Sequence, residues 1–211
     1  MRYVSHLLVF AYQASIRVRG KIFSLLISGA FARFGRNTVL MSPLRLSGEE
    51  RIAIGDFVFF GPDSWLQTIP DGDNKSVAIS IGSRSSASGA CVISAVRSVT
   101  LEESVLLARN VYISDHIHRY ADTDVPVMAQ GVDKIQPVLI KRGAWLGQNV
   151  VVCPGVTIGQ GAVIGANSVV VKDVPDFSVA VGAPARVVKA IRSPESKIAR
   201  NCCITQDKPL K

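Results

Sequence analysis

Residues 140–169 read IKRGAW, LGQNVV, VCPGVT, IGQGAV and IGANSV, which are five consecutive words of six residues. Each word begins with an aliphatic residue, and the beat continues to Val170. Glycine often follows the aliphatic residue, as at Gly147, and a small or β-branched residue often lies four places on, as at Ala144. Neither the 3.6-residue period of a helix nor the two-residue period of a strand explains this spacing. We therefore expect a chain that turns a corner every six residues.

The same six-residue beat is present earlier in the chain. A middle block holds Ile81, Ala87, Ile93, Val99, Val105, Val111 and Ile117, and a shorter one holds Ile54, Phe60 and Leu66. The blocks are out of phase, so we expect loops near residues 67–80 and 118–138. Three short strands would close each coil, and stacked coils would pair through parallel backbone hydrogen bonds. The pattern predicts an all-β protein, a parallel β-helix with aliphatic residues pointing inward.

The pattern divides the chain into three parts. Residues 1–49 form an apolar and basic helical segment that leads into the core, and residues 50–192 form the β-helix domain. Residues 193–211 form a C-terminal tail. The composition fits such a fold, since 48% of residues are hydrophobic and only 7% are aromatic. A short helix is expected at the end of the domain, over Val187 to Ile191.

The charge is unevenly distributed. The formal net charge is +8, and no acidic residue precedes Glu49. A basic chain suits nucleic acid, an anionic membrane or an anionic ligand. The sequence shows no helix-turn-helix, zinc-finger or RNA-binding signature and no basic patch interleaved with aromatic residues. We therefore expect no nucleic-acid partner.

The first 34 residues are mostly apolar. Two apolar stretches, Tyr3 to Ile16 and Ile22 to Ala32, flank a basic cluster at residues 17–21. Each is shorter than the roughly 20 apolar residues that cross a bilayer. We expect one or two helices that either cap the core or lie on an anionic membrane surface. The expected location is the cytoplasm, free or peripheral on the inner face of the membrane.

Cysteines and histidines limit the chemistry. The four cysteines, Cys91, Cys153, Cys202 and Cys203, form no CxxC pair, which argues against a disulfide framework. Zinc bound by three histidines would need ligands on facing coils. The three histidines are His6 in the apolar leader and His116 and His118 two residues apart. No metal is expected.

The segment ISDHIHRY, residues 113–120, holds the candidate base. Histidine is the side chain best suited to remove a proton at neutral pH, because its ordinary pKa lies close to that pH. His116 and His118 would face the same side of an extended segment, and either could serve. We favour His116, because it follows the ordered coil directly.

These words resemble the hexapeptide-repeat acyltransferases over residues 50 to 192. The D-H-x-H motif before PVLIKRGAWLG is similar to maltose and galactoside O-acetyltransferases and to O-acetyltransferases of bacterial surface polysaccharides. The resemblance implies a left-handed parallel β-helix, a homotrimer, acetyl-CoA as donor and a carbohydrate acceptor. It also implies direct transfer to a sugar hydroxyl, with CoA in the groove between two subunits.

The resemblance assigns roles to several residues. The residues that match CoA contacts are Trp145, Gly147, Gly165 and Ala166, and the residues suited to its phosphates are Lys172, Arg186 and Lys189. Ser88 and Tyr120 would contact the acceptor. Related enzymes normally have asparagine at the position of Ser88. Asp115 is expected to be structural, because adjacent side chains on a strand face opposite ways.

Other functions fit the same repeat, because one fold hosts several activities. The acceptor could instead be serine, an amino-sugar nucleotide or a lipid A precursor. A scaffold without catalysis and a zinc enzyme of the γ-carbonic anhydrase type are the alternatives from other classes.

Overall fold

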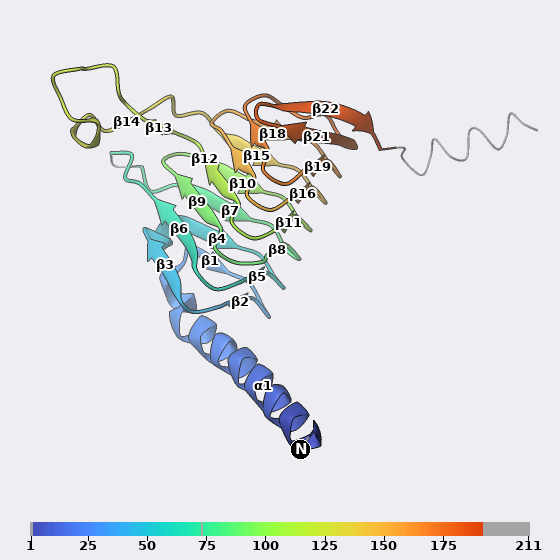
Figure 1. Cartoon of the computed structure of the whole chain (residues 1–211). Helices are drawn as coiled ribbons and strands as arrows, with labels where there is room; N and C mark the ends of the chain where they lie inside the picture. Colours follow the sequence, from blue (N-terminus) through green and yellow to red (C-terminus); the bar gives the residue numbers. More distant parts are fainter. Residues whose placement is uncertain (1, 73, 192–211) are drawn as a thin grey trace, which may run out of the picture.

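The computed structural model describes residues 2–72 and 74–191, and over these residues three parallel sheets form a three-sided prism (Figure 1). Successive strands along the chain lie in successive sheets, so three strands make one coil. The prediction of a mainly β chain with stacked parallel coils and an N-terminal helix is therefore confirmed.

The strands of the three sheets are short. The first sheet contains β1 (Arg33–Phe34), β4 (Ile52–Ile54), β7 (Ile79–Ile81), β10 (Val99–Leu101), β15 (Val138–Ile140) and β18 (Thr157–Ile158). The second contains β2 (Val39–Leu40), β5 (Phe59–Phe60), β8 (Ser86–Ala87), β11 (Leu106–Leu107), β16 (Trp145–Leu146), β19 (Val163–Ile164), β21 (Ser178–Gly182) and β22 (Ala185–Ala190). The third contains β3 (Leu44–Ser47), β6 (Ser64–Thr68), β9 (Val92–Ala95), β12 (Tyr112–Ser114), β17 (Val151–Val152) and β20 (Val169–Val170).

The core is a stack of inward aliphatic side chains. In the first sheet, for example, Ile54 pairs with Ile81, Ile81 with Leu101, and Leu101 with Ile140. All of these are buried, and burying one such side chain contributes about 1.5–3 kcal/mol. The stack begins before residue 50, since Phe34 pairs with Ile54 in the first coil.

Two of the three corners are tight turns with a left-handed residue three places after the inward one. After the second sheet this residue is Asp63, Ala90, Asn110, Asn149 and Asn167 in successive coils. Asparagine tolerates this backbone region better than most residues. The amides of the last three also form a ladder, with Nδ2···Oδ1 distances of 2.9 Å for both steps. Both corners are short in every described coil.

The third corner, where each strand of the third sheet leads to the first sheet, takes the insertions; we call it the loop corner. The longest excursions span residues 69–78 and 115–137. The second contains a small antiparallel pair, β13 (Ile117–His118) and β14 (Val132–Asp133), and a turn of 3-10 helix at Val127–Ala129. Figure 1 shows this excursion extending away from the prism.

The predicted unbroken beat from Ile81 to Ile117 is wrong in register. The inward residues are Ile93 and then Leu101, eight positions later, because two extra residues enter at the loop corner. Val99 is also buried, but it pairs with Ile79 rather than continuing the column of Ile93. Ile117 lies outside the core, in β13.

A single continuous helix, α1 (Arg2–Ile27), leads into the prism, followed by a turn of 3-10 helix at Ser28–Ala30. The basic cluster at residues 17–21 does not interrupt it. Gly20 and Ser24, one turn apart, bring the helix against β2: a Cβ on Gly20 would lie 2.5 Å from Met41 Sδ, and Leu40 N–H donates to Ser24 Oγ at 2.8 Å. Among the described residues, no helix is long and apolar enough to cross a membrane.

The C-terminal end of the domain corrects one expectation. The predicted helix over Val187 to Ile191 is absent, since these residues follow or belong to β22, which pairs antiparallel with β21. The physical reason is that β21 would otherwise be an unpaired sheet edge, which β22 covers. The tail at 193–211, with Cys202 and Cys203, lies outside the described residues.

Candidate active site

His116 lies at the loop corner, between β12 and β13. The chain leaves the third sheet after Ser114 and bends, so residues 115 and 116 belong to no strand. Only 7% of the His116 surface is exposed. The fold therefore places the favoured histidine in a nearly buried position at the start of the longest excursion.

Asp115 contacts the imidazole directly. Its Oδ1 lies 2.8 Å from His116 Nδ1, and the carboxylate itself is completely buried. The expectation that the two adjacent side chains face opposite ways is wrong, because that alternation holds along a strand and this pair sits in a bend. Sequence reasoning missed Asp115 as a partner of the histidine.

The Asp115 carboxylate is held by backbone N–H groups of the preceding coil. Val96 N–H donates to Oδ1 at 2.9 Å, and the N–H groups of Arg97 and Ser98 donate to Oδ2 at 2.7 and 2.8 Å. Burial raises the pKa of this carboxyl, but the hydrogen bonds from His116 and the three N–H groups outweigh burial and hold the pKa below its usual value. Asp115 is therefore an anion that only accepts hydrogen bonds at neutral pH.

This anion determines the tautomer of His116. An ionised carboxylate has no proton to donate, so Nδ1 carries the hydrogen and donates it to Asp115. Ser114 Oγ lies 3.2 Å from Nδ1, but its hydroxyl donates to the carbonyl oxygen of His116 at 2.8 Å. The serine therefore agrees with the same assignment, and the free lone pair of the neutral ring lies on Nε2.

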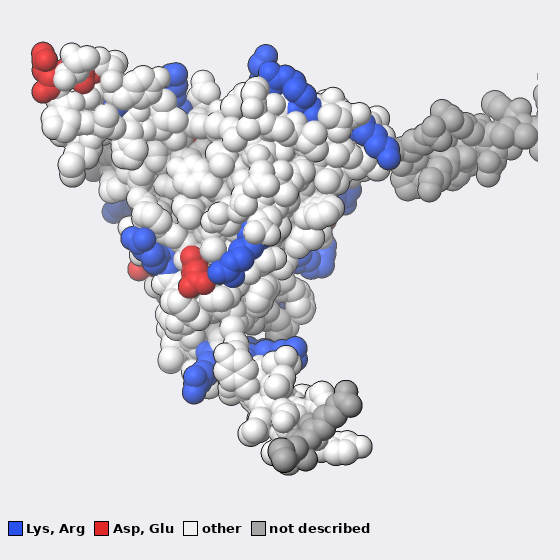
Figure 2. Space-filling view, viewed as in Figure 1, with Lys and Arg blue, Asp and Glu red and all other residues white. Residues whose placement is uncertain are grey.

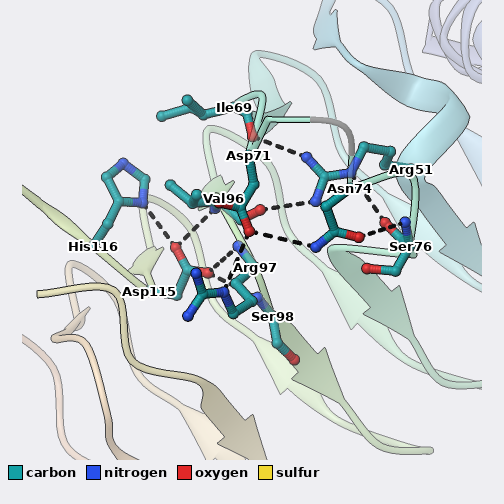
Figure 3. A network of polar contacts seen from close by, with 10 residues as sticks. All are labelled: Arg51, Ile69, Asp71, Asn74, Ser76, Val96, Arg97, Ser98, Asp115 and His116. Carbon is teal, nitrogen blue, oxygen red and sulfur yellow. Dashed lines mark hydrogen bonds and ion pairs between the residues drawn. The ribbon is translucent and has the colours of Figure 1, made fainter. Parts of the chain in front are cut away.

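Nε2 is the atom available for chemistry. Within residues 2–72 and 74–191, Nε2 of His116 has no hydrogen-bond partner. In the same residues, every fully buried polar side-chain atom does have a hydrogen-bond partner. Nε2 must therefore reach the surface. Figure 3 shows this nitrogen on the side of the ring that faces away from Asp115. A buried carboxylate behind a histidine with an accessible Nε2 is the arrangement of a general base.

A buried arginine braces the same corner (Figure 3). Arg51 as a whole is only 5% exposed, and its guanidinium donates to the carbonyl oxygens of Ile69, Ser76 and Val96 at 2.9, 3.0 and 2.8 Å. It thus ties the excursion at 69–78 to Val96, whose N–H group holds Asp115. The histidine is supported through residues of three coils.

His118 and Tyr120 lie farther out on the excursion. His118 pairs with Val132 in the antiparallel β13–β14 ribbon and is exposed. Tyr120 is 64% exposed. The two histidines therefore differ sharply, since His116 has a buried carboxylate partner and His118 is on the surface. The contrast supports His116 over His118.

The residues expected to bind the donor form a separate group. Trp145 lies exposed on the outer face of β16, and Gly147, Gly165 and Ala166 lie at the corner that follows the second sheet. Ser88 belongs to the same corner two coils before Gly147. Within one chain the third sheet separates this corner from the loop corner that holds His116.

The basic residues expected near the phosphates lie at the C-terminal end of the prism. Lys172 and Arg186 line one shallow pocket there, together with Asp173, Ala180 and Val187. Lys189 lies on β22 and is exposed. A single chain thus presents a histidine corner and a separate glycine-rich and basic surface.

A cysteine nucleophile has no support at this corner. Cys153 follows β17 at the loop corner, and burial raises the pKa of its thiol, which keeps it protonated. Burial likewise raises the pKa of Cys91. Among residues 2–72 and 74–191, no three His, Cys, Asp or Glu side chains come together as metal ligands.

Comparison with known sequences agrees with the repeat. The family described as bacterial transferase hexapeptide (six repeats) matches residues 137–172. A Mycobacterium tuberculosis protein named as an acetyltransferase, Rv3034c, is 45% identical over 98 residues, which are 46% of this chain and 32% of that protein. Escherichia coli WbbJ, named for O-acetyl transfer in lipopolysaccharide biosynthesis, is 37% identical over 103 residues, covering 46% of this chain and 53% of WbbJ. The matched part therefore spans about half of these relatives or less.

Comparison with solved structures agrees with the fold. The N-acyltransferase AntD from Bacillus cereus, in complex with dTDP and 3-hydroxybutyryl-CoA, superposes with a TM-score of 0.69 at 19% identity and covers 86% of this chain and 95% of AntD. The hexapeptide-repeat acetyltransferase VCA0836 from Vibrio cholerae gives 0.55 at 22% identity, covering 85% and 93%. At such identities the likeness shows a shared fold. Together, repeat and fold confirm the resemblance to hexapeptide-repeat acyltransferases.

Proposed function

We propose that this protein transfers the acetyl group of acetyl-CoA to a hydroxyl group of a sugar, in a bacterial surface polysaccharide or its precursor. The observation that carries the proposal is the Asp115–His116 pair, with Nδ1 held at 2.8 Å and Nε2 reaching the surface. The relatives named as acetyltransferases, and WbbJ in particular, support the choice of donor and acceptor class.

The reaction follows from the tautomer. Nε2 of His116 removes the proton of the acceptor hydroxyl as its oxygen attacks the thioester carbonyl. The new carbon–oxygen bond forms, the tetrahedral intermediate collapses, and the carbon–sulfur bond breaks. The CoA thiolate then takes the proton from the imidazolium, so the histidine returns to its starting state. Asp115 stabilises the transient imidazolium and stays ionised throughout.

The donor would bind between two copies of the chain. The separation of the His116 corner from Trp145, Gly147 and Gly165 within one chain supports a site completed by a neighbouring subunit. The exposed Lys172, Arg186 and Lys189 are suited to the phosphates of CoA. Ser88 and Tyr120 remain the proposed acceptor contacts. The proposal includes a homotrimer and left-handed coils, as in the enzymes that the repeat resembles.

Thiol release from acetyl-CoA against a panel of acceptors tests this proposal. The panel holds free sugars, lipid-linked glycans, serine and an amino-sugar nucleotide, and O-acetylated sugar is the expected product. Replacing His116 with Ala should lower turnover at least about a hundredfold. Exclusive N-acetylation of the amino-sugar nucleotide would contradict the sugar hydroxyl, and undiminished turnover in the variant would contradict the base.

A further inference from the structure

The outer face of α1 carries an apolar stripe in two parts, at residues 4–8 and 18–26. Gly20 and Ser24 turn one side of the helix toward β2. The opposite side carries apolar residues spaced three and four positions apart, which is the period of a helix face. These residues are 54–78% exposed: Val4, Leu7, Leu8, Val18, Ile22, Leu25 and Leu26. The stripe therefore faces away from the prism and has no cover within the described chain.

Basic side chains border the part of the stripe that lies nearest the prism. At 100° per residue, Arg17 and Lys21 lie along one edge of it and Arg19 lies along the other. All three are exposed, and no acidic residue occurs before Glu49. Figure 2 shows basic atoms where the helix meets the prism and uncharged atoms beyond them. An apolar face between basic edges fits a lipid surface, with hydrocarbon under the stripe and anionic headgroups beside it.

A hollow beside the helix is also lined by both basic and apolar side chains. It lies between α1 and the first coil, and Lys21 and Arg36 line it together with the apolar Leu25 and Phe34. Arg36 is exposed. A headgroup phosphate there would contact Lys21 and share Arg36 with Asp56, whose Oδ2 lies 3.7 Å from the guanidinium, while an acyl chain would contact Leu25. The basic edge of the stripe thus extends onto the prism.

A second copy of the chain suits this face less well. The spacing would also permit a coiled coil, in which flanking charges of opposite sign set the pairing. Here every charged residue on α1 is basic, and a symmetric bundle would bring Arg17, Arg19 and Lys21 of the copies near one another. The charge pattern favours an anionic partner.

We propose that α1 docks the protein on an anionic phospholipid surface, lying along it with the stripe buried at the interface. The proposal is independent of the acetyl-transfer reaction. It accounts for the juxtaposition of an uncovered apolar stripe with basic edges, and it places the prism beside the membrane.

Co-sedimentation of the full chain with vesicles tests the proposal. The protein should bind vesicles of phosphatidylglycerol and phosphatidylcholine, bind phosphatidylcholine alone weakly, and lose affinity as salt is raised. Replacing Arg17, Arg19 and Lys21 with Gln should weaken binding roughly a hundredfold, at about fivefold per residue. Leu8→Gln with Leu25→Gln should weaken it at least about tenfold.

A matched control removes the same charge from the prism. Arg84, Arg109 and Arg142 are exposed at corners of later coils than the one that α1 contacts, and replacing all three with Gln should leave vesicle binding within about twofold. Equal losses in the control and helix variants would overturn the proposal, as would no binding by the unaltered chain. A smaller assembly in light scattering for the leucine variant, without vesicle binding by the parent, would assign the stripe to contacts between copies instead.

Discussion

Asp115→Asn is the most informative single change at the corner. Asp115 Oδ1 accepts from Val96 N–H and His116 Nδ1–H, and Oδ2 accepts from the N–H groups of Arg97 and Ser98. Asparagine has the same shape but one oxygen and one NH2 group. If the NH2 group takes the place of Oδ1, it faces Val96 N–H and His116 Nδ1–H. If it takes the place of Oδ2, it faces the N–H groups of Arg97 and Ser98. In both orientations two donors lose their acceptor. Either the turn at residues 96–98 or the histidine loses its acceptor.

The size of the effect follows from these contacts. Each buried N–H group left unpaired costs about 1–3 kcal/mol, so we expect the free energy of unfolding to fall by about 2–5 kcal/mol. Turnover should fall by about 10²–10⁴, because His116 is no longer held with its proton on Nδ1. Urea denaturation and acetyl-CoA thiol release measure the two effects.

The stability contribution of Asp115 should depend on pH in a definite direction. The folded-state pKa of Asp115 is lower than its ordinary value, so its contribution to stability is complete above about pH 4 and is lost as pH falls through the folded pKa. The gap in unfolding free energy between the parent and Asp115→Asn should therefore narrow as the pH falls below about 4.

A matched control is Asp56→Asn. Asp56 also accepts a backbone N–H, from Arg36 at 2.7 Å, but at a tight corner away from the histidine. We expect this control to lose less than about 1.5 kcal/mol and to keep its turnover. The reasoning would be refuted if Asp115→Asn matched the parent in midpoint and turnover, or if the gap were the same at every pH.

Three further changes follow from the same structure. Arg51→Met removes the donors of three carbonyl groups, of which only that of Val96 belongs to a buried residue, and should lower the free energy of unfolding by about 1–3 kcal/mol in urea. Arg51→Lys should restore only part of this loss, and an unchanged midpoint would contradict the bracing role. His118→Ala should keep turnover within about tenfold, since this side chain is exposed, and a loss as large as that of His116→Ala would count against our choice of base. Gly82→Ala would place a Cβ 2.4 Å from the carbonyl carbon of Glu102 in the next coil and should lower the free energy of unfolding by about 1–3 kcal/mol. In the control Gly29→Ala the new Cβ has nothing within 4 Å and should change the melting temperature little. Equal melting temperatures of the two variants would contradict the close packing of neighbouring coils at Gly82.

The six-residue beat predicts the core because it is a local property of the chain. Ile140, Leu146 and Val152 fall on three successive sheets, as the words indicate. The six-residue spacing does not show where extra residues interrupt the repeat. Two extra residues between Ile93 and Leu101 were hidden because Val99 is also aliphatic and also buried.

The remaining misses depend on tertiary structure. Asp115 looked structural because strand alternation was applied across a bend, and the three N–H groups that hold it come from the preceding coil. The segment at Val187 was taken for a helix because the open edge of β21 is not visible in the sequence. The D-H pair itself is a usable signal, since an acid before a histidine at the end of a coil can reach Nδ1.

Mixing two inactive variants tests the central claim most directly, that His116 of one chain acts on a donor held by another. His116→Ala removes the base, and Ala166→Trp fills the exposed corner expected to hold CoA. Co-expressed and randomly mixed as trimers, they should recover about a quarter of the parent turnover, since each mixed trimer has one intact site. If mixed assemblies stay as inactive as either variant alone, the base and the donor surface do not meet between subunits and the account is wrong.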